Sequence, residues 1–183
     1  MTRLAGRSAR ARDLASGALC CAGAATLLIV CGAGAVVLSG LADDARRALR
    51  FDFAGVEQTP AAALRIALQN ARLVAAALLC AAVVPHRPQQ ARPVADAGLT
   101  LALAANGGLV GLALGAYGTR LAAATAPHLP LELAALCLAG GAYMHARRQP
   151  LGRVVLAAVA ATCALLLVIA ATLETYVRLG GVR

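Results

Sequence analysis

Three residues at the ends of two apolar segments have side chains that could do chemistry together. His128 and Glu132 stand at the start of "APHLPLELAALCLAGG", and Glu174 stands in "AATLETYVRLG". One imidazole and two carboxylates are ligands that could hold a zinc ion with an open position, as an intramembrane hydrolase would need. A histidine and a glutamate on either side of a proline need not share a helix face. The sequence therefore predicts no metal ion here.

Each of the two acids also has an ordinary structural explanation. With Pro130 in the first turn of a helix, Glu132 lies near the helix N-terminus, where the partial positive charge favours a carboxylate by about 0.3–1 kcal/mol. His128 would then lie in the preceding loop. Glu174 precedes Arg178 by one helical turn, which suits an ion pair on one helix face.

Two arginines lie within an apolar segment as well. Arg65, Gln69 and Arg72 follow one another at positions i, i+4 and i+7, so they share one stripe of a helix. Arg65 is close enough to the segment's end for its charge to reach the lipid head groups. Arg72 lies two turns deeper, where a charged group costs at least about 2.5–3.5 kcal/mol. The sequence predicts a buried acidic partner for Arg72.

A third apolar segment carries a pattern for packing. In "AANGGLVGLALG", Gly107, Gly111 and Gly115 repeat every fourth residue, and Asn106 precedes them. Small residues at this spacing let two helix backbones approach closely, and the asparagine can donate a hydrogen bond across the contact. The pattern predicts a helix–helix interface, within the chain or between chains.

The elements that position these residues must lie in lipid. The 183-residue chain is 61% hydrophobic, and it has no polar stretch long enough for a separate domain. Its 17 basic residues are all arginine and lie mostly between apolar runs, so the net charge of +9 favours lipid head groups over nucleic acid. The six cysteines lie inside apolar runs without a CxxC pair, which argues against disulfides and zinc clusters.

We predict an all-α polytopic bundle, a single integral membrane domain over residues 1–183 with a basic cytoplasmic tail over 1–17. At about 20 apolar residues per crossing, five membrane helices are expected, over residues 18–41, 61–84, 94–119, 130–146 and 151–177. The fourth is short for a full crossing and could be re-entrant.

Two connecting segments also have a predicted form. "ADDARRALRFDFAGVEQTP" mixes charged and apolar residues, which favours a short amphipathic helix on the membrane surface. "PHRPQQARP" is expected to be an extended turn, because its three prolines disfavour helix. The arginine distribution places the N-terminus in the cytoplasm by a small excess.

The five crossings bring the ionisable residues to one half of the bilayer. The second and fourth helices begin, and the fifth ends, on the same side of the membrane. Low dielectric favours pairing over isolated ions. We therefore predict a charge-paired intramembrane cluster of Arg65, Arg72, His128, Glu132 and Glu174, open to the outer face.

These motifs resemble those of a known family. "APHLPLELAAL" is similar to the His-x-x-x-Glu signature of the stage II sporulation protein M family, with Leu129 where that family usually has glycine. "ALQNARLVA" resembles its asparagine-bearing second helix, "AANGGLVGLALG" its third helix, and "AATLETYV" its closing segment. The resemblance spans residues 61–177 and implies a membrane fold. It also implies a role in envelope remodelling, as an anchor or scaffold for peptidoglycan-degrading partners, without implying sporulation.

The leading functional hypothesis is a non-enzymatic scaffold in the bacterial cytoplasmic (inner) membrane. The chain has no GxSxG or HExxH motif and no nucleotide-binding loop, so no catalytic residue and no cofactor are predicted. Expected partners are the lipid bilayer and an envelope hydrolase or other membrane protein, with homo-oligomerisation left open and no nucleic acid. The alternative is a small transporter or export subunit in which intramembrane Glu and Arg residues serve the substrate or relay protons.

Overall fold

The computed structural model describes residues 2–51 and 56–177, with side chains from residue 12 onward. Across these residues the secondary structure is helical, without a strand. The helices are α1 (Thr2–Ser39), α2 (Ala42–Leu49), α3 (Pro60–Val83), the short 3-10 helix η1 (Val84–His86), α4 (Ala91–Tyr117), α5 (Thr119–Thr125), α6 (Leu129–Ala146) and α7 (Arg153–Tyr176).

Five of these helices are long and apolar enough to cross a membrane. The apolar segments are Arg12–Ser39, Pro60–His86, Ala91–Tyr117, Leu129–Ala146 and Arg153–Tyr176. The predicted fold class, an all-α bundle with five apolar helices, is confirmed, and it is compatible with a multi-pass membrane protein. The 18 residues of α6 extend over about 27 Å, which is close to a hydrocarbon core of about 30 Å.

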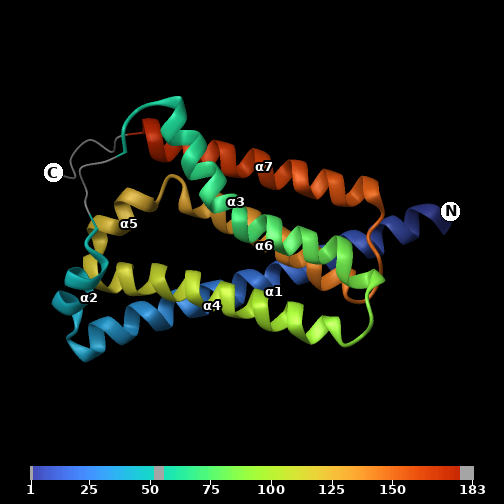
Figure 1. Ribbon diagram of the computed structural model, residues 1–183, viewed down its shortest axis with the longest axis horizontal. Helices are drawn as coiled ribbons and strands as arrows, with labels where there is room; N and C mark the ends of the chain where they lie inside the picture. Colours follow the sequence, from blue (N-terminus) through green and yellow to red (C-terminus); the bar gives the residue numbers. More distant parts are fainter. Residues whose placement is uncertain (1, 52–55, 178–183) are drawn as a thin grey trace.

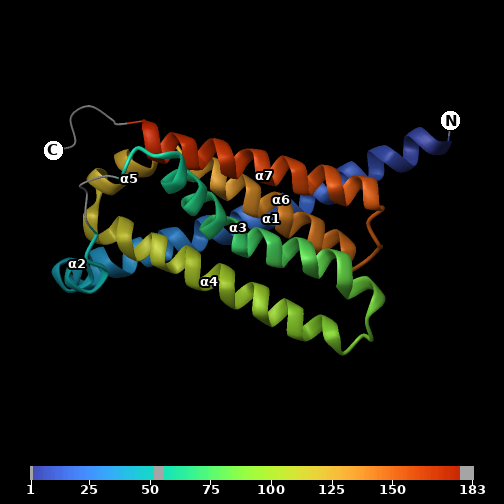
Figure 2. The same cartoon turned by 45° about the horizontal axis from the view of Figure 1, so that its top comes forward.

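The helices run roughly along one direction, so the bundle has two ends (Figure 1). We call the end where α2, α5, the start of α3 and the end of α7 lie the α5 end. The opposite end carries the start of α1, the turn between α3 and α4, and the turn between α6 and α7 (Figure 2). His128, at the start of α6, and Glu174, near the end of α7, therefore lie toward the α5 end.

Helix α6 forms the centre of the bundle, packed by α1, α3 and α7. Ala135, Ala139 and Ala142 are completely buried, and with Val74 of α3 and Cys163 of α7 they belong to the largest cluster of buried apolar residues. Small side chains let these helices approach closely, so dispersion contacts replace a core of large residues. This burial distinguishes α6 from the helices whose outer faces remain exposed.

The glycine repeat of α4 packs against α1 of the same chain. A Cβ atom on Gly111 would overlap the carbonyl oxygen of Ile29, and one on Gly115 would lie 2.7 Å from the carbonyl oxygen of Ala33. Asn106 lies outside this contact, since its amide donates to the Ala102 carbonyl of its own helix at 2.8 Å. The interface is thus formed within the chain, and among the described residues the side-chain amide of Asn106 bonds to its own helix and not across the contact.

A second close approach joins α1 to α6. A Cβ atom on Gly141 would lie 2.7 Å from both the Ala18 nitrogen and the Leu14 carbonyl oxygen, and one on Gly17 would lie 3.0 Å from the Gly141 Cα atom. Glycine on both helices therefore allows the backbone contact.

Helix α5 was not predicted. Gly118 has φ +58°, a conformation that glycine adopts without steric cost, and it separates α4 from α5. The predicted loop between the third and fourth spans, residues 120–129, therefore begins with a further short helix, Thr119–Thr125. This helix leads the chain to the start of α6.

The prediction of an extended turn between the second and third spans is wrong at two of its prolines. Pro85 lies in η1, and Pro93 lies in the first turn of α4. Proline is tolerated in a first turn because the nitrogen there lacks an intrahelical partner. Only Pro88 of the three remains outside a helix.

The N-terminal segment and the connection between α1 and α3 differ in detail from the prediction. Helix α1 begins at Thr2, so the predicted basic tail is helical from Thr2 onward and continuous with the first apolar helix. The predicted amphipathic helix is present as α2, and residues 52–55 lie outside the described residues. Arg46 of α2 donates from Nε to the Ala116 carbonyl at 2.7 Å. This bond attaches α2 to the end of α4.

Candidate functional site

The first turn of α6 places His128 and Glu132 on one side of the helix. The Glu132 backbone nitrogen donates to the His128 carbonyl at 3.2 Å, so the two residues are separated by one helical turn. Pro130 fits here because it lies in the first turn. His128 and Glu132, which flank this proline, therefore lie on the same face of the helix.

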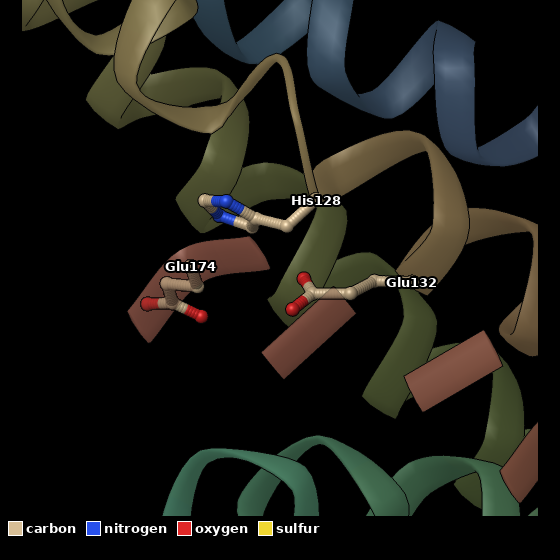
Figure 3. A group of neighbouring side chains, drawn as sticks. All are labelled: His128, Glu132 and Glu174. Carbon is tan, nitrogen blue, oxygen red and sulfur yellow. The ribbon is translucent and has the colours of Figure 1, made fainter. Parts of the chain in front are cut away.

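Glu174 of α7 completes a group with these two residues. Each side chain offers one ligand atom, a His128 nitrogen or a carboxylate oxygen, and these atoms lie within 4.8 Å of one another. Figure 3 shows the imidazole beside the two carboxylates, with Glu174 approaching from the other helix. We call His128, Glu132 and Glu174 the acidic triad.

Asn70 of α3 attaches a third helix to the triad. Its side-chain amide donates a hydrogen bond to Oε1 of Glu132. Asn70 was not among the predicted site residues, although it stands in the "ALQNARLVA" motif. The sequence could have predicted a role for Asn70, because an amide side chain inside an apolar helix is costly unless it finds a polar partner.

His128 is the most enclosed member of the triad. Its side chain belongs to a residue only 9% exposed, and its Nδ1 atom has no hydrogen-bond partner in the described part of the chain. His128 precedes the apolar segment Leu129–Ala146. Burial lowers the pKa of His128 below its ordinary value, which favours the neutral imidazole with a free lone pair.

A cavity of about 370 Å³ adjoins the triad between α1, α3, α4 and α6. Its polar lining comes from Gln69, Asn70, Arg72, Asn106 and Glu132, and the rest of its wall is apolar. The cavity therefore presents a cation, a carboxylate and three amides within a bundle of apolar helices. Glu132 belongs both to this wall and to the triad.

The two predicted arginines do not pair with the acids. Neither Arg65 nor Arg72 forms an ion pair with another residue that the structure describes, and both are exposed. Asn70 takes the position against Glu132, and residues two apart on a helix do not share a face. The prediction of a charge-paired cluster thus fails for the arginines, whereas His128, Glu132 and Glu174 do come together.

A second polar group, missed from the sequence, ties α4 to α6 at the other end of the bundle. The Tyr143 hydroxyl donates to Asp96 Oδ1 at 2.6 Å, and Arg147 Nη2 lies 2.8 Å from Asp96 Oδ2. The five crossings place Asp96 and Arg147 on one side of the membrane, so the reasoning that grouped the triad could also have found this pair.

Replacing Asp96 by alanine is expected to lower the free energy of unfolding by about 1–3 kcal/mol, because the Tyr143 hydroxyl, in a residue 5% exposed, loses its acceptor. The melting temperature in detergent, followed by size-exclusion chromatography, measures this. Asp43→Ala is the matched control, since the Asp43–Arg46 pair is largely exposed and such pairs contribute about 0–1 kcal/mol. Equal melting temperatures for the two variants would contradict the expectation.

No protein-family model, no curated protein and no solved structure matches this chain.

Proposed function

We propose that this chain is a small non-enzymatic membrane transporter, or the membrane subunit of an export system, with its solute site in the cavity between α1, α3, α4 and α6. The observation that carries the proposal is the lining of that cavity, where Arg72 and Glu132 face the same space without forming an ion pair. Ionisable side chains among apolar membrane helices are costly and typically mark a pathway for an ion or a solute.

Each group in the cavity wall has a role in this proposal. Arg72 binds an anionic group of the solute, because guanidinium forms strong hydrogen bonds to carboxylate or phosphate oxygens. The side-chain amides of Gln69 and Asn106 provide both donors and acceptors. The apolar remainder of the wall would contact the nonpolar part of a solute, as the walls of ligand pockets commonly do. The substrate class is therefore a small anionic or zwitterionic solute.

Solute flux into proteoliposomes tests this proposal. Vesicles carrying the full chain are expected to take up one of a panel of labelled solutes: inorganic phosphate, dicarboxylates, acidic amino acids and chloride. Arg72→Gln should reduce this flux about 10- to 100-fold, since a hydrogen bond to a charged group contributes about 1.5–3 kcal/mol. Arg65→Gln is the matched control, because Arg65 lies on the same helix outside the cavity lining.

Two results would contradict the transport proposal. One is the absence of uptake for every solute of the panel in vesicles that retain folded protein. The other is an Arg72→Gln flux equal to that of Arg65→Gln.

The scaffold in envelope remodelling and membership of the stage II sporulation protein M family stay predictions. The glycine-lined face motivated the scaffold, and Gly111 and Gly115 pack on α1 of the same chain. That face is therefore occupied and offers no surface to a partner. Transport has the more specific support, which is the polar cavity.

We further propose that the chain resides in a bacterial cytoplasmic membrane with its N-terminus in the cytoplasm. The support is the small arginine excess on that side. In this orientation the α5 end, with the acidic triad, lies toward the outer face.

A further inference from the structure

We propose that His128, Glu132 and Glu174 bind one divalent transition-metal ion, zinc or manganese, and that the ion ties α6 to α7. The inference concerns ion binding alone and holds whether or not the chain transports a solute. It rests on the geometry of the triad, the unpaired histidine nitrogen and the two adjacent carboxylates.

The geometry of the triad is close to that of a metal site. Its three ligand atoms lie within 4.8 Å of one another. Ligand atoms around one tetrahedral zinc ion are roughly 3.3–3.6 Å apart, given bonds of about 2.0–2.2 Å. Movements of about 1 Å by each side chain close this difference, and the two glutamates can make them by rotating their side chains. Backbone rearrangement of α6 or α7 is not needed.

The histidine supplies the second and independent observation. Nδ1 of His128 is buried without a hydrogen-bond partner among the described residues, in a residue that is 9% exposed. A buried polar atom left unsatisfied costs about 1–3 kcal/mol, so native proteins rarely leave one without a reason. Figure 3 shows the imidazole ring lying beside both carboxylates. A metal ion held between these side chains would accept a lone pair from the neutral imidazole.

The charges in the triad also call for a cation. Glu132 and Glu174 bring two carboxylates together in a half-buried position, and neither Arg65 nor Arg72 pairs with them. Like charges at this distance repel strongly where water is scarce. A divalent ion neutralises both carboxylates at once.

The surrounding residues fit the requirements of such a site. Asn70 donates to Glu132, and a hydrogen bond of this kind orients a carboxylate ligand from the outer shell. One imidazole with two carboxylates suits zinc or manganese. Calcium and magnesium bind mainly oxygen, with six or more ligands. Three protein ligands leave a coordination position open.

The test uses the purified full-length protein in detergent. After exposure to zinc or manganese and removal of free metal, the protein is expected to retain one equivalent of one of these metals, measured by mass spectrometry of the element. Titration calorimetry gives the affinity. His128→Ala and Glu174→Gln should each weaken it at least about tenfold, since even outer-shell substitutions cost about 10- to 100-fold.

Matched controls and a second readout separate metal binding from folding. His86→Ala and Glu57→Gln alter an exposed histidine and an exposed glutamate elsewhere, so both should bind metal like the wild type. Metal should raise the melting temperature of the wild type and of both controls, and not that of Glu174→Gln. This readout holds even if His128→Ala fails to fold.

Two results would overturn the inference. One is binding of well below one equivalent of both metals by the wild type, without a rise in melting temperature. The other is metal binding by Glu174→Gln that is as tight as that of Glu57→Gln. Because no step of this experiment measures flux, failure of the transport proposal leaves its outcome unchanged.

Discussion

Replacing Gly111 by alanine is expected to lower the free energy of unfolding by about 3 kcal/mol. The added Cβ atom would overlap the carbonyl oxygen of Ile29, and the Cα atoms of Ile29 and Gly32 lie 3.0 Å from its position. These are backbone atoms, so no side-chain rotation can make room. Helices α1 and α4 must separate, and the dispersion contacts along their length are lost with the separation.

Gly108 is the matched control for this substitution. It lies on the same helix, and nothing lies within 4 Å of a Cβ atom placed on it. Gly108→Ala should leave the melting temperature unchanged or raise it, because alanine favours helix over glycine by about 1 kcal/mol. Thermal unfolding of both variants in detergent decides between them. Equal melting temperatures for Gly111→Ala and Gly108→Ala would contradict the close approach of α1 and α4 at Gly111.

Replacing Ala139 by leucine should be similarly destabilising, by about 3 kcal/mol. Ala139 is completely buried in the middle of α6, within the cluster that also contains Val74 and Leu167. Three additional carbon atoms there displace α3 or α7, since the site has no exposed side into which leucine can turn. The loss of the monodisperse protein on heating measures the effect.

Ala134→Leu provides the comparison within the same helix. Ala134 is exposed, so leucine there can extend into the surrounding lipid or detergent at little cost. A stability change within about 0.5 kcal/mol is expected, as for surface substitutions in general. Equal destabilisation by the two leucines would mean that α6 does not lie at the centre of the bundle.

The long apolar helices could be predicted because their signal is simple. A membrane helix needs about 20 consecutive apolar residues, and runs of this length stand out between the arginines. Gly107, Gly111 and Gly115 also predicted a helix contact. The sequence left open which helix they contact, since the partner, α1, is itself only a series of small and apolar residues around Gly32.

The details that were missed depend on single residues. Helix α5 follows from the positive φ of Gly118, a conformation that a sequence permits without requiring. Pro85 and Pro93 were read as helix breakers, although proline is compatible with a first turn. In each case the local residue allows two structures, and the packing of the neighbouring helices selects one.

The candidate site was predictable only in part, since three of its members were expected and their hydrogen-bond partner was not. Counting crossings brought His128, Glu132 and Glu174 to one end of the bundle, where their ligand atoms lie within 4.8 Å. The same counting also included Arg65 and Arg72, because it gives depth in the membrane and says little of rotation about the helix axis. Rotation instead placed Asn70 against Glu132.

The contacts of α1 have a consequence for biogenesis. Gly32 meets Gly111, and Gly17 meets Gly141, so α1 packs on segments that leave the ribosome roughly 80 residues after it or more. At about 5–20 residues per second, α1 waits for several seconds before its partners are inserted. During that interval the surfaces around Gly17 and Gly32 face lipid or the insertion machinery, and a delay in translation would prolong the exposure of α1 to quality-control proteases.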